Sequence, residues 1–157
     1  MQIVQILLDR NADFQKANKY GETPCLIAAK NGHEDVVRLL HQIGADVNQP
    51  RNDGQTPCYV AALFGHEDIV RLLHQIGADV HQPNNEGKTP LQIAREKNRT
   101  AVVAFLEPIY EQKRQEEAAE RKRQQEAAER KRQQEAAERK RQEEEAERKR
   151  QEEEAER

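Results

Sequence analysis

Apolar and polar positions follow a helical pattern that recurs along the first two thirds of the chain. Within residues 34–41, apolar side chains fall at positions i, i+1, i+3 and i+4. This spacing predicts an amphipathic helix with one side available to a core, namely Val36, Val37, Leu39 and Leu40. A shorter apolar run, residues 25–30, precedes it and contains two adjacent alanines that permit close packing. The pattern therefore predicts short helices in pairs.

The boundaries of these helices carry the same signals in each copy. The phrase Gly-x-Thr-Pro begins at Gly21, Gly54 and Gly87, so the unit recurs every 33 residues. Its threonine can cap a helix and its proline is tolerated at the first helical position. Asn31-Gly32 breaks the first helix, and Gly44 suits a left-handed residue after the second. A fixed period of this length predicts a solenoid, whose surface holds partners rather than performing chemistry.

A long internal copy strengthens this interpretation. Residues 31–47 return almost unchanged as residues 64–80. With the Gly-x-Thr-Pro phrases they resemble ankyrin repeats, closely over residues 21–48 and 54–80 and more weakly over 87–106. Two positions depart from the family pattern: the leucine after Thr-Pro is Cys25 and Cys58, and the usual histidine is Leu26, Tyr59 and Gln92. The resemblance implies an all-α ankyrin-repeat solenoid of helix-turn-helix units joined by extended turns, followed by one long charged helix.

The resemblance also predicts the domain organisation. We expect ankyrin repeats over residues 1–107, with full repeats starting near residues 13, 46 and 79, and a charged tail over residues 108–157. Residues 1–12 align with the second helix and turn of a repeat and are expected to form a half repeat. Its apolar side chains would be poorly covered, so we expect either a fragment of a longer array or something docked there.

The other end of the array is predicted to be a cap. In the third repeat Arg95 replaces the second alanine, and Asn98-Arg99 replaces the Gly-His pair. No Gly-Ala-Asp turn follows Phe105-Leu106. Polar substitutions of this kind are what a terminal repeat needs.

A second repeat, of nine residues, begins after Tyr110. The sequence Gln-Glu-Glu-Ala-Ala-Glu-Arg-Lys-Arg of residues 115–123 recurs from Gln124, Gln133, Gln142 and Gln151 with small changes. Every residue is a good helix former, so we predict a continuous helix. At about 100° per residue, nine residues make two and a half turns, so alanine pairs of successive copies lie on opposite sides. No apolar seam for a coiled coil results.

Charge pairing is predicted to hold this helix. The i,i+4 pairs are Glu117–Arg121, Glu126–Arg130, Glu135–Arg139 and Glu144–Arg148 in one order, and Lys122–Glu126, Lys131–Glu135 and Lys140–Glu144 in the other. About fifteen such pairs at ~0.2–0.5 kcal/mol give very roughly 3–7 kcal/mol. The tail resembles the Glu/Arg/Lys-rich single α-helices that serve as stiff arms between domains. A coiled coil and disorder are the alternatives.

Composition narrows the functional class. Neither the first 110 residues nor the tail has a strong single-sign charge, so nucleic-acid binding is not indicated. No apolar run approaches 18 residues, so no membrane span is expected, and Met1–Asp9 does not read as a signal peptide. Cys25 and Cys58 are one repeat apart, about 10 Å, which is beyond disulfide reach. Free thiols favour a cytoplasmic protein, with the nucleus left open.

Candidate chemistry is sparse. His33 and His66 recur in the Gly-His turn and are interpreted as structural, whereas His41 and His74 are expected to be solvated. No histidine or cysteine pair has metal-site spacing, no glycine-rich phosphate loop is present, and the chain has no serine. We expect no catalytic residue, no metal and no cofactor, and hence no enzyme.

The resemblance places a partner-binding surface on the turn tips and first helices, which form the concave side. The matching residues are Lys19, Tyr20, Glu22, Lys30, Asn31, Asn52, Asp53, Gln55, Leu63, Phe64, Asn85, Glu86 and Lys88, with Glu96 and Lys97 beyond them. Tyr20, Leu63 and Phe64 stand out because exposed aromatic and large apolar side chains anchor interfaces. Packing of Tyr20 and Phe64 on neighbouring turns is an equally good interpretation.

The sequence thus predicts a non-enzymatic adaptor that binds a protein partner, with a stiff helical spacer. We expect a monomer unless the half repeat docks. Two alternatives stay open. The charged helix could self-associate or bind a partner helix in a structural protein, or the chain could recruit substrate within a larger enzyme.

Overall fold

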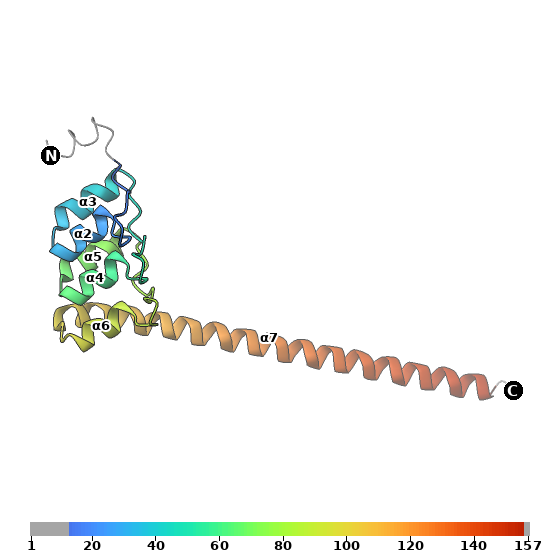
Figure 1. Ribbon diagram of the computed structural model, residues 1–157. Helices are drawn as coiled ribbons and strands as arrows, with labels where there is room; N and C mark the ends of the chain where they lie inside the picture. The colour runs from blue at the N-terminus through green and yellow to red at the C-terminus, as the bar shows by residue number, and fades with distance from the viewer. Residues whose placement is uncertain (1–12, 156–157) are drawn as a thin grey trace. The chain divides into compact units, whose positions relative to one another are not determined.

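The computed structural model describes residues 13–155, and every regular element in that range is an α-helix (Figure 1). The predicted all-α class is therefore confirmed. The half repeat expected over residues 1–12 lies outside the described residues. The chain divides into two compact units, Met1–Tyr110 and Glu111–Arg157.

Helices of the first unit come in pairs that stack along it. The elements are α2 (Pro24–Asn31) with α3 (Glu34–Gln42), α4 (Pro57–Phe64) with α5 (Glu67–Gln75), and α6 (Pro90–Glu96) with the start of α7 (Thr100–Ala155). The first helices α2, α4 and α6 pack in succession, and α3 packs on α5 (Figure 1). Pairs of helices repeated in this way give the helix-turn-helix solenoid that the 33-residue period predicts.

Each first helix begins in the same way. Thr23, Thr56 and Thr89 have extended backbone, and each hydroxyl accepts a hydrogen bond from the amide three residues on, at 3.2–3.3 Å. Proline follows each threonine, where its missing N–H costs no helical hydrogen bond. Gln92 completes the third cap because its side chain accepts from the Thr89 amide at 2.8 Å. The helix starts are as the sequence predicts.

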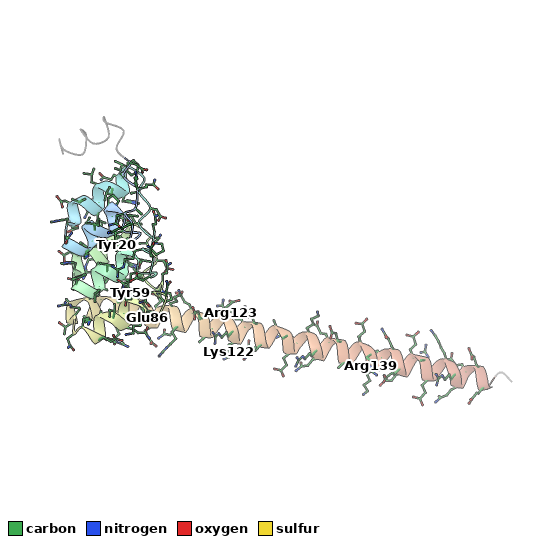
Figure 2. All side chains as sticks on the ribbon, in the orientation of Figure 1. Tyr20, Tyr59, Glu86, Lys122, Arg123 and Arg139 are labelled. Carbon is green, nitrogen blue, oxygen red and sulfur yellow. The ribbon has the colours of Figure 1, made fainter. Side chains whose placement is uncertain are left out.

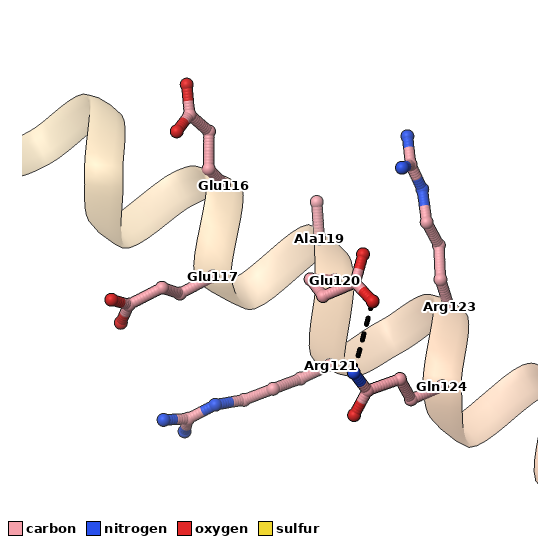
Figure 3. A pocket seen from close by; sticks show the side chains of 7 residues that line it. All are labelled: Glu116, Glu117, Ala119, Glu120, Arg121, Arg123 and Gln124. Atoms are coloured by element: carbon pink, nitrogen blue, oxygen red, sulfur yellow. Dashed lines mark hydrogen bonds between the residues drawn. The ribbon is translucent and has the colours of Figure 1, made fainter.

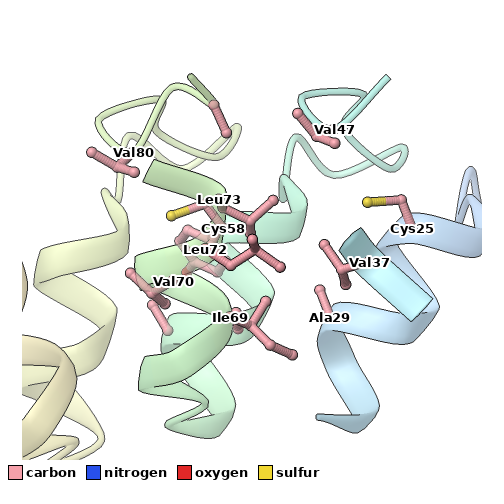
Figure 4. Packing of buried hydrophobic residues seen from close by; sticks show 14 of the residues in the cluster. Cys25, Ala29, Val37, Val47, Cys58, Ile69, Val70, Leu72, Leu73 and Val80 are labelled. Carbon is pink, nitrogen blue, oxygen red and sulfur yellow. The ribbon is translucent and has the colours of Figure 1, made fainter. Parts of the chain in front are cut away.

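The core lies between the stacked pairs and is continuous through the three repeats. Ala29, Val37, Val70 and Leu73 are all inaccessible to solvent, as the labelled side chains of Figure 4 illustrate. Cys25 and Cys58 are part of this core as free, buried thiols. Burial raises the pKa of Cys25 to about 11 and that of Cys58 to about 12, so both stay protonated and unreactive at neutral pH.

One residue predicted for the core is more exposed than expected. Val36 is 37% exposed, whereas Ile69, its counterpart one repeat on, is 1% exposed. Ile69 lies on α5, which has α3 packed beside it. No helix within residues 13–155 packs on α3 in the corresponding way, and Val36 is left partly uncovered. The repeat pattern supplies an apolar residue at this position whether or not a neighbour covers it.

The Gly-His turn ties successive repeats together. The Nε2 atom of His66 hydrogen-bonds the Lys30 carbonyl at 3.1 Å, which confirms the structural interpretation for this histidine. In the third repeat Arg99 takes the same place and donates from Nε to the Leu63 carbonyl at 3.0 Å. Asn98 replaces the glycine and is the only non-glycine residue of the described chain with positive φ, at 54°. The weaker third repeat thus preserves the linkage with different side chains.

The C-terminal face of the stack carries the polar cap that the sequence predicts. Arg95, which stands where Ala29 and Ala62 lie buried in the first two repeats, forms an ion pair with Glu107. This pair links α6 to the first part of α7 beside the half-buried Val103. A charged pair at this position gives the last repeat a polar outer face that can contact solvent.

The second helix of the third repeat differs from its predecessors in how it ends. Helices α3 and α5 stop just before Gly44 and Gly77, whose φ angles are 87° and 83°. The matching position is Tyr110, and α7 continues through it to Ala155. A bulky residue disfavours the left-handed conformation that stops the other two helices. The Tyr110 hydroxyl instead donates to the Val80 carbonyl at 2.7 Å, and burial raises the tyrosine pKa to about 12.

The second unit consists of the remainder of α7, in which every described side chain is exposed. Seven ion pairs form along it, which are Glu111–Arg114, Lys122–Glu126, Lys131–Glu135, Arg139–Glu143, Lys140–Glu144, Glu145–Lys149 and Arg148–Glu152. At ~0.2–0.5 kcal/mol each, these pairs contribute roughly 1.5–3.5 kcal/mol to the stability of the helix. This is half of the contribution expected from the sequence for about fifteen pairs.

The order of these pairs corrects the sequence-based expectation. The predicted Lys-first pairs form, but the four predicted Glu-first pairs with arginine do not occur among the ion pairs of residues 111–155. The reason is competition, because Glu135 lies four residues from both Lys131 and Arg139. It pairs with Lys131 at 3.8 Å, and Arg139 pairs onward with Glu143 at 3.1 Å.

Candidate partner-binding surface

The predicted binding residues gather on three turn tips, defined as residues 18–22, 51–55 and 84–88, and on the first helices beside them. Each tip is closed by a backbone hydrogen bond from its first residue to its last, at 2.9–3.0 Å. A glycine with φ near 80° stands in each tip, at Gly21, Gly54 and Gly87. Tight turns of this kind are ordered before any partner arrives.

The tips are linked to one another by a ladder of hydrogen bonds. The amide of Asn52 donates to the Tyr20 carbonyl at 3.1 Å, and that of Asn85 donates to the Asp53 carbonyl at 3.0 Å. The Nδ2 atoms of the same two asparagines bond the Lys19 and Asn52 carbonyls, at 3.2 and 3.1 Å. Asn52 and Asn85, predicted as partner contacts, therefore use these donors to hold the tips together. Their recurrence one repeat apart is the sequence signal for this role.

Close packing between repeats makes two of the tip glycines, Gly21 and Gly54, necessary. A Cβ atom at Gly54 would contact the Asn85 side-chain oxygen and lie 2.7 Å from its backbone nitrogen. Gly21 is packed against Asn52 in the same way. At Gly77, which also has positive φ, no atom would lie within 4 Å of such a Cβ. Gly21 and Gly54 therefore serve contact between repeats as well as turn geometry, whereas at Gly87, in the last tip, no atom would lie within 4 Å of such a Cβ.

Charged side chains of the first repeat form a connected cluster. Glu22 accepts from the Asn18 side chain at 2.9 Å and pairs with Lys30 at 3.5 Å and Arg51 at 3.6 Å. The Asn18 hydrogen bond, helped by Lys30 and Arg51, lowers the pKa of Glu22 below its ordinary value. Arg51 also binds Asp53 through two hydrogen bonds, at 2.6 and 2.8 Å, which lower the pKa of Asp53. Arg51 was not predicted as a surface residue because Asn18 and Asn84 occupy its position in the other two repeats.

The third repeat has an ion pair at the same positions with the charges exchanged. Lys88 corresponds to Glu22, Glu96 corresponds to Lys30, and the two are joined at 3.0 Å. The hydrogen bond from Lys88 to Glu96 raises the pKa of the lysine. Glu86 is exposed on the same tip as Lys88 (Figure 2).

The second repeat has no charge at these positions. Gln55 and Leu63 stand where the other two repeats have an ion pair. Leu63 is half-buried against the core. The Oε1 atom of Gln55 is buried and has no hydrogen-bond partner among the described residues. An unsatisfied buried acceptor of this kind costs about 1–3 kcal/mol.

Exposed apolar side chains lie at both ends of the first helices. Tyr20 is 58% exposed on the first tip, with Lys19 Nζ 4.9 Å from its ring centroid (Figure 2). Phe64, at the end of α4, is 43% exposed and stacks on His66 with 6.4 Å between ring centroids. Ile27, which the sequence analysis did not select, is 40% exposed. Asn31 donates to the Ile27 carbonyl at 3.0 Å, so its amide is engaged within its own helix.

The remaining candidates for a ligand site are the histidines and one hollow on the charged helix. No group of three or more histidine, cysteine or acidic side chains within residues 13–155 is placed to hold a metal ion. His41 and His74 are exposed as expected, and His74 also meets the edge of Phe105 at 5.8 Å. A hollow beside Glu120 and Arg123 is lined by one helix alone, where Gln124 bonds Glu120 at 3.0 Å (Figure 3). With walls from a single exposed helix, it cannot enclose a ligand.

Comparison with known families agrees with the geometry. The family model described as ankyrin repeats (3 copies) matches residues 1–84 and 44–114. The match covers most of the chain, and the protein belongs to the ankyrin-repeat family. Members of this family are in general protein-interaction modules rather than enzymes. No curated protein matches the chain. None of the helices described here combines the length and apolar character needed to cross a bilayer.

Proposed function

We propose that this chain is a non-enzymatic adaptor that binds a protein partner on the concave side of its ankyrin stack. The observation that carries the proposal is the combination of an ordered polar surface with exposed apolar anchors. The tips are fixed by their hydrogen-bond ladder, and Tyr20 and Phe64 remain open to solvent. A preordered surface spends little binding energy on ordering, and exposed aromatic side chains supply strong contacts.

The helix of residues 111–155 acts in this proposal as a spacer. Helical residues in this number extend by about 70 Å. The fully exposed side chains and the local ion pairs of residues 111–155 support an isolated helix. The free, protonated thiols of Cys25 and Cys58 support a reducing, cytoplasmic location.

The binding surface is tested by removing its aromatic anchors. Immobilised full-length chain should retain specific proteins from a cell extract, and the double variant Tyr20→Ala with Phe64→Ala should lose them. The matched control is His41→Ala with His74→Ala, which changes two exposed second-helix residues. Circular dichroism must show that both variants fold. Equal retention by the anchor variant and the control would remove Tyr20 and Phe64 from the proposal.

The spacer is tested on residues 108–157 alone. Helicity by circular dichroism and mass by sedimentation are followed over a hundredfold range of concentration. A monomer of constant helicity supports the spacer. Helicity that rises with self-association would replace it with a structural role for the charged helix.

A further inference from the structure

The three repeats differ in the residues that fill one pair of positions. The pair is Glu22 with Lys30 in the first repeat, Gln55 with Leu63 in the second, and Lys88 with Glu96 in the third. The outer two repeats fill the pair with opposite charges in contact. Only the central repeat fills it with an apolar side chain and a neutral amide. We call these six residues the paired strip.

We propose that the paired strip binds an extended partner segment carrying an acidic, an apolar and a basic side chain at every third residue, with the apolar side chain seated on Leu63. This inference rests on the adaptor function proposed above.

The charge order follows from which member of each pair faces solvent. In the first repeat the side chain of Lys30 is 40% exposed and that of Glu22 only 14%. In the third repeat the margin is small, with the side chain of Glu96 47% exposed and that of Lys88 40%. The strip therefore presents a cation at Lys30, an apolar centre at Leu63 and an anion at Glu96. A complementary segment is acidic over the first repeat, apolar over the second and basic over the third.

The spacing follows from the stacking of α2, α4 and α6. Packed helices lie about 8–10 Å apart, so equivalent positions of successive repeats recur at that interval. A polyproline II chain has three residues per turn and rises about 3.1 Å per residue, so every third side chain faces the same way at about 9 Å. A β-strand would send every third side chain to alternating faces. The polyproline II conformation therefore fits the repeat.

The neutral amide of Gln55 favours the same conformation. Its buried Oε1 atom has no partner among residues 13–155. A partner group that donates a hydrogen bond to this oxygen would satisfy it. The backbone of a polyproline II segment has free N–H groups, whereas those of a helix are already engaged. An α-helical partner, which would match the strip at every seventh residue, is the competing occupant.

The strip offers variants that the fold should tolerate, because neighbouring repeats already contain the same residues. Gln55→Lys with Leu63→Glu copies the third-repeat pair into the second repeat and removes the apolar centre. Lys88→Gln with Glu96→Leu copies the second-repeat pair into the third repeat and adds an apolar position. Thermal melting of each variant checks that it folds.

The experiment is selection of displayed random 16-residue peptides on the full-length chain and on both variants. Wild-type chain should enrich peptides with an acidic, an apolar and a basic residue at every third position. Their Kd, measured by fluorescence anisotropy, should rise at least tenfold in Gln55→Lys with Leu63→Glu. The Lys88→Gln with Glu96→Leu variant should enrich peptides in which a second apolar residue replaces the basic one.

Three results would overturn the inference. Peptides with a seven-residue spacing would make the occupant a helix. Peptides whose Kd is unchanged by the swap at Gln55 and Leu63, but which are lost in Tyr20→Ala with Phe64→Ala, would place the anchor elsewhere and leave the adaptor function standing. Failure of the folded chain to enrich any peptide would count against the adaptor function as well.

Discussion

The ankyrin stack and the charged helix are both α-helical, but they maintain their helices by different means. Helices α2 to α6 have seven to nine residues each, shorter than the 12–15 at which an isolated helix becomes marginal in water. They persist because their apolar sides are buried against neighbouring repeats. Residues 111–155 bury no side chain and rely on propensity and local ion pairs. The stack is therefore sensitive to packing, and the helix to salt.

The largest effect is expected from a cavity in the stack. Leu73→Ala removes a side chain with no exposed surface from the centre of the core. The free energy of unfolding should fall by about 2–5 kcal/mol, because the lost contacts and the remaining void both destabilise. Urea titration of the full-length chain measures the change. Ala128→Gly in the exposed helix is the control, and it should cost only about 1 kcal/mol of local helix stability. Equal effects of the two variants would mean that burial does not distinguish the two units.

The next effect compares two glycines with the same turn geometry, of which only Gly54 is in close contact with the next repeat. Gly54→Ala should lower the free energy of unfolding by about 2–5 kcal/mol, since it combines left-handed strain with a clash against the Asn85 backbone. Gly77→Ala has the same positive φ but open space, and should cost only about 1–2 kcal/mol. Thermal melts of the two variants give the difference directly. A Gly77 variant as unstable as the Gly54 variant would show that the ladder of tips contributes nothing.

Added salt should destabilise the charged helix but not the ankyrin stack. Raising sodium chloride from about 0.1 to 1 M shortens the Debye length from about 10 to 3 Å and weakens exposed ion pairs. The helicity of isolated residues 108–157 should decrease, because the helix loses up to the roughly 1.5–3.5 kcal/mol of stability that seven ion pairs supply. The melting temperature of the stack should stay constant or increase slightly. Unchanged tail helicity at high salt would assign its stability to propensity alone.

The smallest effect concerns acid. The pKa of Glu22 is lowered in the folded chain, so this carboxylate contributes stability above about pH 4, and the contribution is lost as pH falls through the lower folded value. Glu22→Gln should therefore make the acid limb of a stability–pH curve shallower and leave the curve flat above that range. Glu86→Gln, on an exposed tip, is the control. A curve for the Glu22 variant that parallels wild type would show that the cluster with Lys30 and Arg51 is not coupled to folding.

Most of the fold could be predicted because its signals are local. Caps at Thr23, Thr56 and Thr89 need only a threonine before a proline, and the repeat period transfers each assignment to the next copy. The exposure of Val36 could not be predicted, since it depends on what lies beside α3. The choice of ion pairs in the tail could not be predicted either, because each glutamate of the predicted pairs has a lysine four residues before it and an arginine four residues after it.

The binding surface was less predictable for the same physical reason. Family resemblance selects positions, but the use of each side chain depends on contacts between repeats. The side chains of Asn52 and Asn85 donate hydrogen bonds to the preceding tip. Arg51 joins the surface through its ion pair with Glu22, and Ile27 is exposed on α2. The exchange of charges between the first and third repeats is visible in the sequence only after the structure shows which positions form a pair.

Tyr110 also bears on how such an array can be enlarged. Tandem duplication adds a unit by copying one whose helices both begin and end within it. The units that end at Gly44 and Gly77 meet this condition. The unit ending at Tyr110 does not, because its second helix has no stop. A new copy placed after it would inherit a helix where a turn is needed. Enlargement is therefore confined to insertion upstream of the last unit, and the near-identical neighbours at residues 31–47 and 64–80 lie in the region that permits it.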